Sequence, residues 1–430
     1  MKMKKMSLLL VICLLLLTSC VSQTGNGENI NSSNFSSDDP SIEIVSDACF
    51  IRGNHQGIIS QNTAFFAKLT TGPVTYNFFD DIQSEAILLT NYFVGTEDDN
   101  PFMGMSSVIT FMINDEEATL KNDGMPVVYI LFKYSKPVYE NGVRVDFEDF
   151  CKILRCDTSS LKFEIIKDGI SPQVQSFDLY KDIFIYTTND GDQGYNIHCI
   201  NKDGSNYRKM DNPDKRMCRV QTVYRDKLYY HDERSGQIYV CNVSDFGNTQ
   251  VVCKANIQSA AFAYNGYLYF SASQRRVDLG KGKSKVVCDI HRVSVDDFSK
   301  SEQVIEGVLT GNLIGDKYYY FHIDNVAELS IGPGKPGSGL PAEATTIVDG
   351  GYRVCLSYDP MNGKTETFYD MGENYAAGGY LARYPIDITD DYVLFYCNMI
   401  DSSKSHYQYM DRTTNIVDVI PHNFDQSIIQ

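Results

Sequence analysis

Histidine is the side chain used most often for metal binding and for proton transfer near neutral pH. The seven histidines of this sequence lie at positions 55, 198, 231, 291, 322, 406 and 422. None of them stands in the H-E-x-x-H or H-x-H spacing of a zinc site. His198 and His291 each follow an isoleucine that opens an expected strand, where Tyr239 stands in a third strand. We therefore interpret them as strand positions that accept His or Tyr, and we predict no metal site.

Three short stretches match catalytic or ligand-binding loops in part. "GMSSV" (104–108) lacks the second glycine of a G-x-S-x-G nucleophile elbow. "GPGKPGSG" (332–339) places Pro336 after Lys335, where a phosphate-binding loop needs Ser or Thr for magnesium. "NDGD" (189–192) lacks the distal part of a calcium loop, and Asn, Asp and Gly suit a hairpin turn. We predict no catalytic residue and no cofactor from these stretches.

Adjacent acidic residues occur at 80–81, 98–99, 296–297 and 390–391. A glycosidase needs two carboxylates that converge in one cleft. Neighbouring residues of a strand point to opposite faces, so adjacency in the sequence does not bring two carboxylates together. These pairs leave open, as an alternative function, a hydrolase or lyase that acts on polysaccharide or peptide.

The stretch "QRRVDLGKGKSK" concentrates positive charge in an otherwise acidic chain. Its basic residues are Arg275, Arg276, Lys281, Lys283 and Lys285. We expect all five in one loop between two strands, at 274–285. The loop is either a solvated surface segment or a contact site for an anionic polymer or another partner. These residues are the ligand-binding candidates of the sequence.

The N-terminus has the organisation of a secretory signal. Lys2, Lys4 and Lys5 precede an uncharged apolar run from Leu8 to Leu17. This run is shorter than the roughly 20 apolar residues that a spanning helix needs. A basic start followed by a short apolar run is typical of a signal peptide, which we expect at 1–19.

The end of this run, Leu17-Thr18-Ser19-Cys20, resembles the bacterial lipobox. The resemblance implies cleavage before Cys20 and attachment of a diacylglyceryl group to its sulfur, with palmitate as a fatty acid. Two or three acyl chains hold a protein on a membrane lastingly, whereas one chain does so marginally. Residues 20–40 are rich in Ser, Asn, Gly and Asp and predict a flexible stalk. We expect a lipid-anchored protein on the extracytoplasmic face of the cell membrane.

The formal net charge of the chain is −17. An acidic protein is repelled by nucleic acid and by anionic lipid head groups. The charge therefore argues against a nucleic-acid partner and leaves the N-terminal lipid as the expected contact with the membrane.

The body of the chain repeats one pattern of strands and turns. "YKDIFIYTTNDG" from Tyr180, "YRDKLYYHDERSG" from Tyr224 and "YNGYLYFSASQ" from Tyr264 each combine an aromatic residue, a polar two-residue turn and an alternating strand. A second strand of the form Ile-(His/Tyr)-x-(Ile/Cys/Val) follows. The pattern returns from Ile314 and Thr389, and fainter versions begin near 60 and 122. Alternation with aromatic and β-branched residues favours strands.

The starts at 180, 224, 264 and 314 are 44, 40 and 50 residues apart. Such periods, with several short strands in each, are typical of β-propeller blades. We expect an all-β, seven-bladed β-propeller of four-stranded antiparallel blades, with six or eight blades as alternatives. One blade cannot bury both of its faces alone, so the blades should form a single domain at 41–430. The Gly/Pro-rich stretch at 328–342 predicts an insertion within one blade.

Ten cysteines remain apart from Cys13 and Cys20, and no C-x-x-C occurs. An even number outside the cytoplasm permits disulfides. Cys156 and Cys241, however, occupy the repeat position that Ile200 and Val293 hold elsewhere. A position shared by Cys, Ile and Val is a buried apolar site, so we expect mostly unpaired thiols.

The repeat, a Tyr-x-(Asp/Gly)-x-(Leu/Ile)-Tyr strand followed by an Ile-(Tyr/His) strand and an Asp-Gly turn, resembles a known family. This is the uncharacterised bacterial family named for its likeness to the β-propeller of low-density lipoprotein receptor-related proteins. The resemblance spans residues 120–420 and brings no catalytic residues. The Tyr-Trp-Thr-Asp signature of the receptors is absent, because the sequence contains no Trp.

Together these observations predict a membrane-tethered lipoprotein whose propeller is a binding or assembly platform for a protein or an envelope polysaccharide. The expected contact segments are 274–285 and 328–342, on the principle that function resides in the loops of such a scaffold. A non-catalytic role is favoured over the hydrolase or lyase alternative.

Overall fold

The computed structural model of the chain describes residues 50–52, 54–55, 57–60, 63–68, 72–77, 87–88, 108–122, 127–157, 162–255, 261–280, 283–331, 346–372, 379–388, 392–400, 404–415 and 417–420. The predicted signal peptide at 1–19, Cys20 and the stalk at 20–40 lie outside the described residues. Within the described ranges, no helix is both long and apolar enough to cross a membrane.

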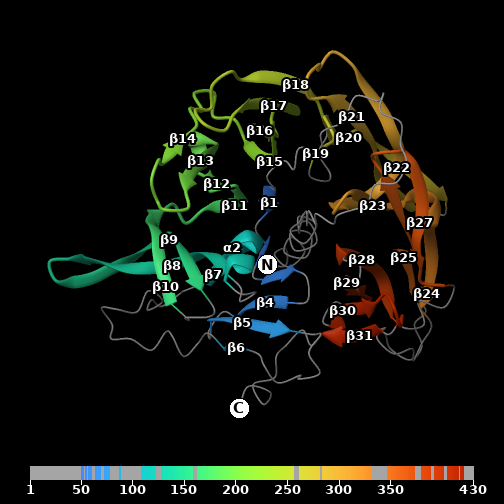
Figure 1. Ribbon diagram of the computed structural model, residues 1–430, viewed down its shortest axis with the longest axis horizontal. Coiled ribbons are helices and arrows are strands. Elements are labelled where there is room, and N and C mark those ends of the chain that lie inside the picture. The colour runs from blue at the N-terminus through green and yellow to red at the C-terminus, as the bar shows by residue number, and fades with distance from the viewer. Residues whose placement is uncertain are drawn as a thin grey trace, which may run out of the picture.

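The described chain is almost entirely β-structure, arranged as sheets around a common centre in the manner of a β-propeller (Figure 1). The sheets follow one another around this centre in chain order, and we number them in that order. The described elements that are not strands are helix α2 (Glu116–Lys121) and the 3-10 turns η2 (Gly191–Gln193) and η3 (Ile323–Asn325).

The first two sheets contain the earliest strands of the chain. The first sheet is formed by β3 (Gly57–Ser60), β4 (Thr63–Lys68), β5 (Gly72–Asn77) and β6 (Ile87–Leu88). The second sheet is formed by β2 (Asn54–His55), β7 (Val108–Asn114), β8 (Val127–Glu140), β9 (Val143–Asp157) and β10 (Lys162–Ile170).

The third and fourth sheets are the most regular. The third is formed by β1 (Phe50–Arg52), β11 (Val174–Tyr180), β12 (Ile183–Asn189), β13 (Tyr195–Asn201) and β14 (Arg208–Lys209). The fourth is formed by β15 (Cys218–Tyr224), β16 (Lys227–Asp232), β17 (Gln237–Asn242) and β18 (Gln250–Lys254).

The last two sheets are the largest. The fifth contains β19 (Phe262–Tyr264), β20 (Tyr267–Gly280), β21 (Lys283–Ser294), β22 (Ser301–Ile314), β23 (Lys317–His322), β26 (Val354–Asp359) and β27 (Lys364–Asp370). The sixth contains β24 (Val326–Ile331), β25 (Thr346–Tyr352), β28 (Tyr380–Ile388), β29 (Tyr392–Met399), β30 (His406–Asp411) and β31 (Val417–Ile420).

Strand β22 makes the fifth sheet seven-stranded because it takes part in two neighbouring units. Its first half, from Ser301 to Val308, pairs with β21, and its second half, from Val308 to Ile314, pairs with β23. The sheet therefore consists of β19–β22 and of β22–β23–β26–β27, two four-stranded units that share one long strand.

The expectation of uniform four-stranded antiparallel blades is too simple. The third and second sheets each gain a strand from the N-terminal segment, since β1 pairs with β11 and β2 pairs with β7. Of these two short strands, β1 is labelled near the common centre in Figure 1. The sixth sheet gains the hairpin β24–β25, which joins β28 by a parallel contact between Tyr352 and Ala382. The ends of the described ring approach each other where β28 contacts β3, although no described strand pair joins the first and sixth sheets.

The predicted repeat starts at 180, 224 and 264 are the turns between the first two strands of a sheet. These are two-residue turns that need positive φ, as in type I′ hairpins. Lys181 has φ +53°, Arg225 and Asp226 have +49° and +58°, and Asn265 and Gly266 have +46° and +77°. The start at 314 precedes the two-residue turn between β22 and β23, where Gly315 has φ +60°. The starts near 60 and 389 lie at the ends of β3 and β28, and the residues that connect these strands to β4 and β29 lie outside the described residues. The turn residues explain the repeated Tyr-x-(Asp/Gly) pattern.

The leading tyrosine of a repeat binds the turn of the next sheet. The Tyr180 hydroxyl of the third sheet accepts a hydrogen bond from the Asp226 amide of the fourth sheet (3.3 Å) and donates one to Asp226 Oδ1 (3.1 Å). In the same way, the Gly266 amide of the fifth sheet donates to the Tyr224 hydroxyl of the fourth (2.9 Å). Asp226 and Gly266 occupy the same position of their turns, so one contact repeats from sheet to sheet.

Apolar cores fill the spaces between successive sheets. One core joins Tyr129 and Ile153 of the second sheet to Phe177 and Phe184 of the third. Further cores join the third to the fourth sheet, the fourth to the fifth, the two units of the fifth, and the fifth to the sixth. From the second sheet to the sixth, successive sheets thereby bury faces against each other, as the radial packing of blades requires.

Most of the described cysteines lie in these cores. Nine described cysteines are free, and all but the half-buried Cys253 are buried. Cys156 and Cys241 are buried like Ile200 and Val293, which confirms that the shared repeat position is apolar. The prediction of unpaired thiols is confirmed for the described cysteines.

We predict that Tyr180→Phe and Tyr224→Phe each lower the free energy of unfolding by about 1 kcal/mol, because each removes a hydrogen bond between sheets. Urea unfolding followed by circular dichroism measures the change. Tyr139→Phe, at an exposed hydroxyl, is the control and should leave the free energy unchanged. An effect of the first two substitutions no larger than that of the control would contradict a stabilising role.

We also predict that the native protein reacts slowly with a thiol reagent. Burial raises the pKa of the Cys151, Cys199 and Cys241 thiols to about 12, which leaves almost no reactive thiolate at neutral pH. After denaturation without reductant, all nine described thiols should react. Recovery of these cysteines as disulfides in peptide mass spectrometry would overturn the assignment.

Candidate functional site

Antiparallel pairing gives the strands two distinct ends. We count the strands of each unit without the added strands β1 and β2. At one end lie the connections between first and second strands, which are two-residue turns or, between β7 and β8, the segment with helix α2, and the short turns between third and fourth strands, such as 201–205 and 242–247. At the other end lie the connections between second and third strands and the connections between sheets, such as 189–195 and 210–217. We call the first the turn face and the second the loop face.

Three long hairpins of the described chain begin at the loop face. The hairpins β8–β9 and β20–β21 join second and third strands, and the hairpin β24–β25 lies between β23 and β26. Figure 1 shows β8–β9 projecting well beyond the sheets. Binding residues are most often carried by loops on a rigid scaffold, so the loop face is the candidate binding face.

Arg275, Arg276, Lys283 and Lys285 lie in the strands of the hairpin β20–β21 and not in a loop, so the expectation of a loop is wrong for these four. Arg275 pairs with Val287, Arg276 with Val286, and Lys285 with Val277. The pairing continues to Lys283, and Lys281 lies outside the described residues. The reason is that β20 and β21 pair with each other as far as Gly280 and Lys283, so the antiparallel ladder continues into the predicted loop.

Arg275 is engaged within the protein. Its Nη1 donates to both carboxylate oxygens of the buried Asp289 (2.6 and 2.7 Å), and its Nη2 donates to Glu306 Oε1 (2.9 Å). The Gly307 amide also donates to Asp289 Oδ1 (3.0 Å). Although burial acts to raise it, these hydrogen bonds hold the pKa of Asp289 below its ordinary value. Arg275 thus fastens β20, β21 and β22 together where their ladders are irregular.

Two further basic residues of the hairpin are described with their side chains. Arg276 is exposed. Lys285 is half-buried, with its ammonium 5.8 Å from the centre of the Tyr352 ring in β25. This contact brings the hairpins β20–β21 and β24–β25 together at the loop face. The stretch 332–345, which contains most of the predicted insertion, lies outside the described residues.

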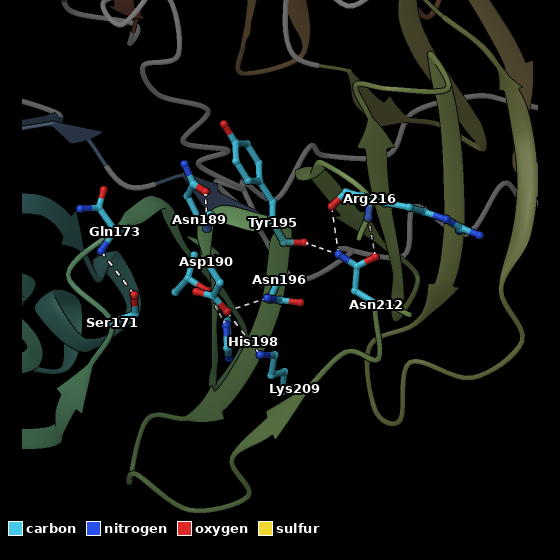
Figure 2. Close-up of polar contacts among 12 residues, drawn as sticks. Ser171, Gln173, Asn189, Asp190, Tyr195, Asn196, His198, Lys209, Asn212 and Arg216 are labelled. Atoms are coloured by element: carbon cyan, nitrogen blue, oxygen red, sulfur yellow. Dashed lines mark hydrogen bonds and ion pairs between the residues drawn. The ribbon is translucent and has the colours of Figure 1, made fainter. Parts of the chain in front are cut away.

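The stretch 189–192 forms a closed turn on the loop face, as predicted (Figure 2). Asn189 Oδ1 accepts from the Gly191 amide (3.0 Å). Asp190 Oδ2 accepts from Asn196 Nδ2 (2.6 Å) and lies 3.4 Å from Lys209 Nζ. The side chains that a calcium ion would need therefore hold the turn itself. In the described part of the chain, no group of three or more His, Cys, Asp or Glu could hold a metal ion.

The side-chain amide of Asn212 links the third sheet to the segment that leads into the fourth. Asn212 Nδ2 donates to the Tyr195 carbonyl (3.0 Å) and to the Arg216 carbonyl (2.9 Å), and its Oδ1 accepts from the Arg216 amide (2.8 Å) (Figure 2). A β-carbon on Gly194, which has φ +79°, would lie 2.6 Å from the Arg216 carbonyl oxygen. The two loops therefore fit together only with glycine at this position.

The repeat position of His198, Tyr239 and His291 is one half of a cross-strand aromatic pair. His198 stacks on Tyr186 with ring centres 4.8 Å apart, and Tyr239 stacks on Tyr230 at 5.4 Å. His291 contacts Phe270 at 6.0 Å. These contacts confirm the interpretation as a strand position that accepts His or Tyr.

His198 is buried and neutral. Its Nε2 lies 2.9 Å from Thr188 Oγ1, and its Nδ1 lies 3.0 Å from the Tyr207 hydroxyl. Burial, with a smaller effect of Lys209, lowers the pKa of His198 to about 4. A base this weak and this buried has a structural role at neutral pH.

Of the acidic pairs, Asp296 and Asp297 are described. They lie in the exposed turn between β21 and β22, on the turn face, where Asp297 Oδ1 accepts from the Ser299 amide (2.9 Å). This hydrogen bond lowers the pKa of Asp297. The pairs at 80–81, 98–99 and 390–391 lie outside the described residues.

Sequence reasoning missed the tip of the β8–β9 hairpin. Tyr139, Val143 and Val145 are 61%, 66% and 50% exposed there. The turn between them is Asn141-Gly142, with φ +50° and +79°. Asn-Gly between two alternating strands is a strong hairpin signal and could have located this tip.

We predict that His198→Gln reduces the loss of stability in acid. Because the folded-state pKa of His198 is lowered from 6.5 to about 4, the unfolded state binds more protons between these values, and stability falls as the pH falls. The effect approaches roughly 3 kcal/mol near pH 4. Urea unfolding at pH 7 and pH 4.5 measures it. Titration of the His198 ring signals near pH 6.5 in the native protein would contradict the assignment.

No protein-family model and no curated protein matches the sequence. Among solved structures, the β-propeller domain of the Trilobed protease from Pyrococcus furiosus is similar at a TM-score of 0.41 and 12% identity, over 69% of this chain and 80% of that chain. Dipeptidyl peptidase 4 from Porphyromonas gingivalis is similar at 0.38 and 9%, over 82% and 51%. The β-propeller domain of Cps50 (Swd1) from Myceliophteria thermophila is similar at 0.33 and 10%, over 64% and 83%. Similarities at this level carry no functional argument.

Proposed function

We propose that the protein is a lipid-anchored binding or assembly platform on the extracytoplasmic face of the membrane. Its loop face binds a protein or an anionic envelope polysaccharide. The observation that carries this proposal is that the three long hairpins β8–β9, β20–β21 and β24–β25 all rise from the loop face, whereas the described connections of the turn face are short turns and the segment that contains helix α2.

The anchor of this proposal is Cys20, on the strength of the lipobox-like sequence before it. About 30 residues separate Cys20 from β1. A flexible chain of that length has a root-mean-square span of roughly 30 Å. Such a stalk lets the sheets turn relative to the membrane and present the loop face to a ligand.

The body of the platform is proposed to be a seven-bladed propeller. Counting β22 once in each of its two units turns the fifth sheet into two blades, so the described sheets correspond to seven units. The contact of β28 with β3 supports closure of the ring. The repeat pattern supports a relation to the bacterial family that resembles the receptor-related propellers.

The alternative function, a hydrolase or lyase on polysaccharide or peptide, ranks second. Such an enzyme would gather carboxylates near the centre of the ring. The described pair Asp296 and Asp297 lies instead in an exposed turn on the turn face. In addition, β1 and β2 occupy edges of two sheets, where they pair with β11 and β7.

The test is a pull-down of the full chain, with Cys20→Ser to prevent acylation, against envelope fractions and purified anionic glycans. Arg276, Lys281, Lys283 and Lys285 are changed together to Gln, while Arg275 is kept because it holds Asp289. We expect about a tenfold loss of binding and a weaker dependence on salt, since four charges are removed from the contact.

The matched control changes Lys227, Lys300, Lys317 and Lys364 to Gln, which removes the same charge from the turn face. This variant should bind like the unchanged protein. Equal binding by both variants would reject the β20–β21 hairpin as the contact site.

A further inference from the structure

The β8–β9 hairpin leaves the second sheet as an isolated arm. Strand β7 pairs with β8 as far as Lys133, and β10 pairs with β9 as far as Cys151. Beyond these residues, no described strand borders the arm, which continues to the turn at Asn141-Gly142. A two-stranded hairpin alone is marginally stable in water, so an arm of this length gains by contact with another surface.

The tip of the arm is both apolar and acidic. Tyr139, Val143 and Val145 are exposed there by 61%, 66% and 50%. Glu140 pairs with Val143 and Val138 with Asp146, so Val143 shares its face of the hairpin with the exposed Glu140 and Asp146, whereas Tyr139 belongs to the other face. An exposed apolar position bordered by polar residues is typical of a contact site. Glu148 adds a further exposed acidic side chain. The segment 138–149 carries four acidic residues and one basic residue.

The β20–β21 hairpin has the complementary character. Leu279 and Val286 are 38% and 37% exposed, and the exposed Arg276 pairs with Val286 across the ladder. The segment 275–285 carries five basic residues and one acidic residue. Arg275 is held by Asp289 and Glu306, so the exposed Arg276 is the described residue that supplies outward charge; without Arg275 the segment still carries four basic residues against one acidic residue.

These two hairpins cannot meet within one molecule. Figure 1 shows β8–β9 projecting from one side of the ring and β20–β21 standing on the other side. Both belong to the loop face, as connections between second and third strands. The complementary surfaces are therefore available only to different molecules.

We propose that the tip of β8–β9 of one molecule docks on the β20–β21 hairpin of a second copy of this chain. The inference rests on the proposed binding role of the loop face and names one partner of that face. The contact is head-to-tail, because two different patches meet, so it builds open chains or closed rings of copies. Anchoring in one membrane plane would concentrate the copies and favour the contact.

Two hairpin tips bury less than the roughly 1,600 Å² of a standard interface, so the contact is weak in solution. We expect a dissociation constant on the order of 10–100 µM. Sedimentation equilibrium of the full chain, with Cys20→Ser and up to about 300 µM protein, should give a weight-average mass that rises with concentration above that of one chain. The rise should diminish in high salt.

Charge reversal tests the pairing of the two hairpins. One variant carries Glu140→Lys, Asp146→Lys and Glu148→Lys, and the other carries Arg276→Glu, Lys283→Glu and Lys285→Glu. Each variant alone should sediment as a single chain, because its two hairpins now have the same sign of charge. An equimolar mixture should associate, since each variant then meets a partner of opposite charge. Recovery in the mixture also shows that both variants are folded.

The apolar contribution is tested with Val143→Ser, which should weaken association several-fold. Met361→Ser, at an equally exposed apolar residue on the turn face, is the matched control and should leave association unchanged. A wild-type protein that remains a single chain at about 300 µM would overturn the proposal. Reversal variants that associate alone, or that do not associate when mixed, would also overturn it. Because these experiments contain no envelope material, their failure leaves the pull-down result intact.

Discussion

A propeller blade has two faces to bury, and one sheet cannot shield both of them from water alone. The structure meets this constraint by placing an apolar core between successive sheets, from the second sheet to the sixth. Most of the described cysteines belong to these cores, where they act as small apolar side chains. Stability of this kind depends on neighbours, so no blade is expected to fold independently of the ring.

The same constraint separates a structural end of the molecule from a variable one. On the turn face, Tyr180 and Tyr224 bind the turn of the next sheet, which keeps those turns short and of one type. On the loop face, connections are held by local contacts such as those of Asn212. Nothing comparable limits the length of the connections between second and third strands, and three of them have grown into long hairpins.

The polar side chains that first suggest chemistry serve this architecture. Asp190 and Asn196 close a turn, Arg275 and Asp289 fasten three strands, and His198 fills an aromatic pair. The hydrogen-bonding groups of Asp190, Arg275 and His198 are bound to other groups of the protein. Function is therefore sought in the hairpins of the loop face, which carry exposed apolar and charged side chains.

The amino-acid sequence by itself determined the strands, the positions of the repeats and the apolar nature of the cysteine positions. These features are local: alternation, an Asn-Gly or Arg-Asp turn and the shared position of Cys241 and Val293 are all visible within a few residues. Turn geometry and side-chain alternation act over the same short distance, which is why these predictions hold.

Tertiary structure alone decided the rest. Whether 274–285 is loop or strand depends on how far the ladder between β20 and β21 continues beyond the pair Arg276–Val286. The register of a ladder is set by both strands together. Arg275 donates a hydrogen bond to Glu306 of another strand. Strand β1 pairs with β11, which lies more than 100 residues further along the chain. The division of β22 between two units also requires both neighbours to be in place. Such contacts are set by packing between distant segments, and no local pattern in the sequence records them.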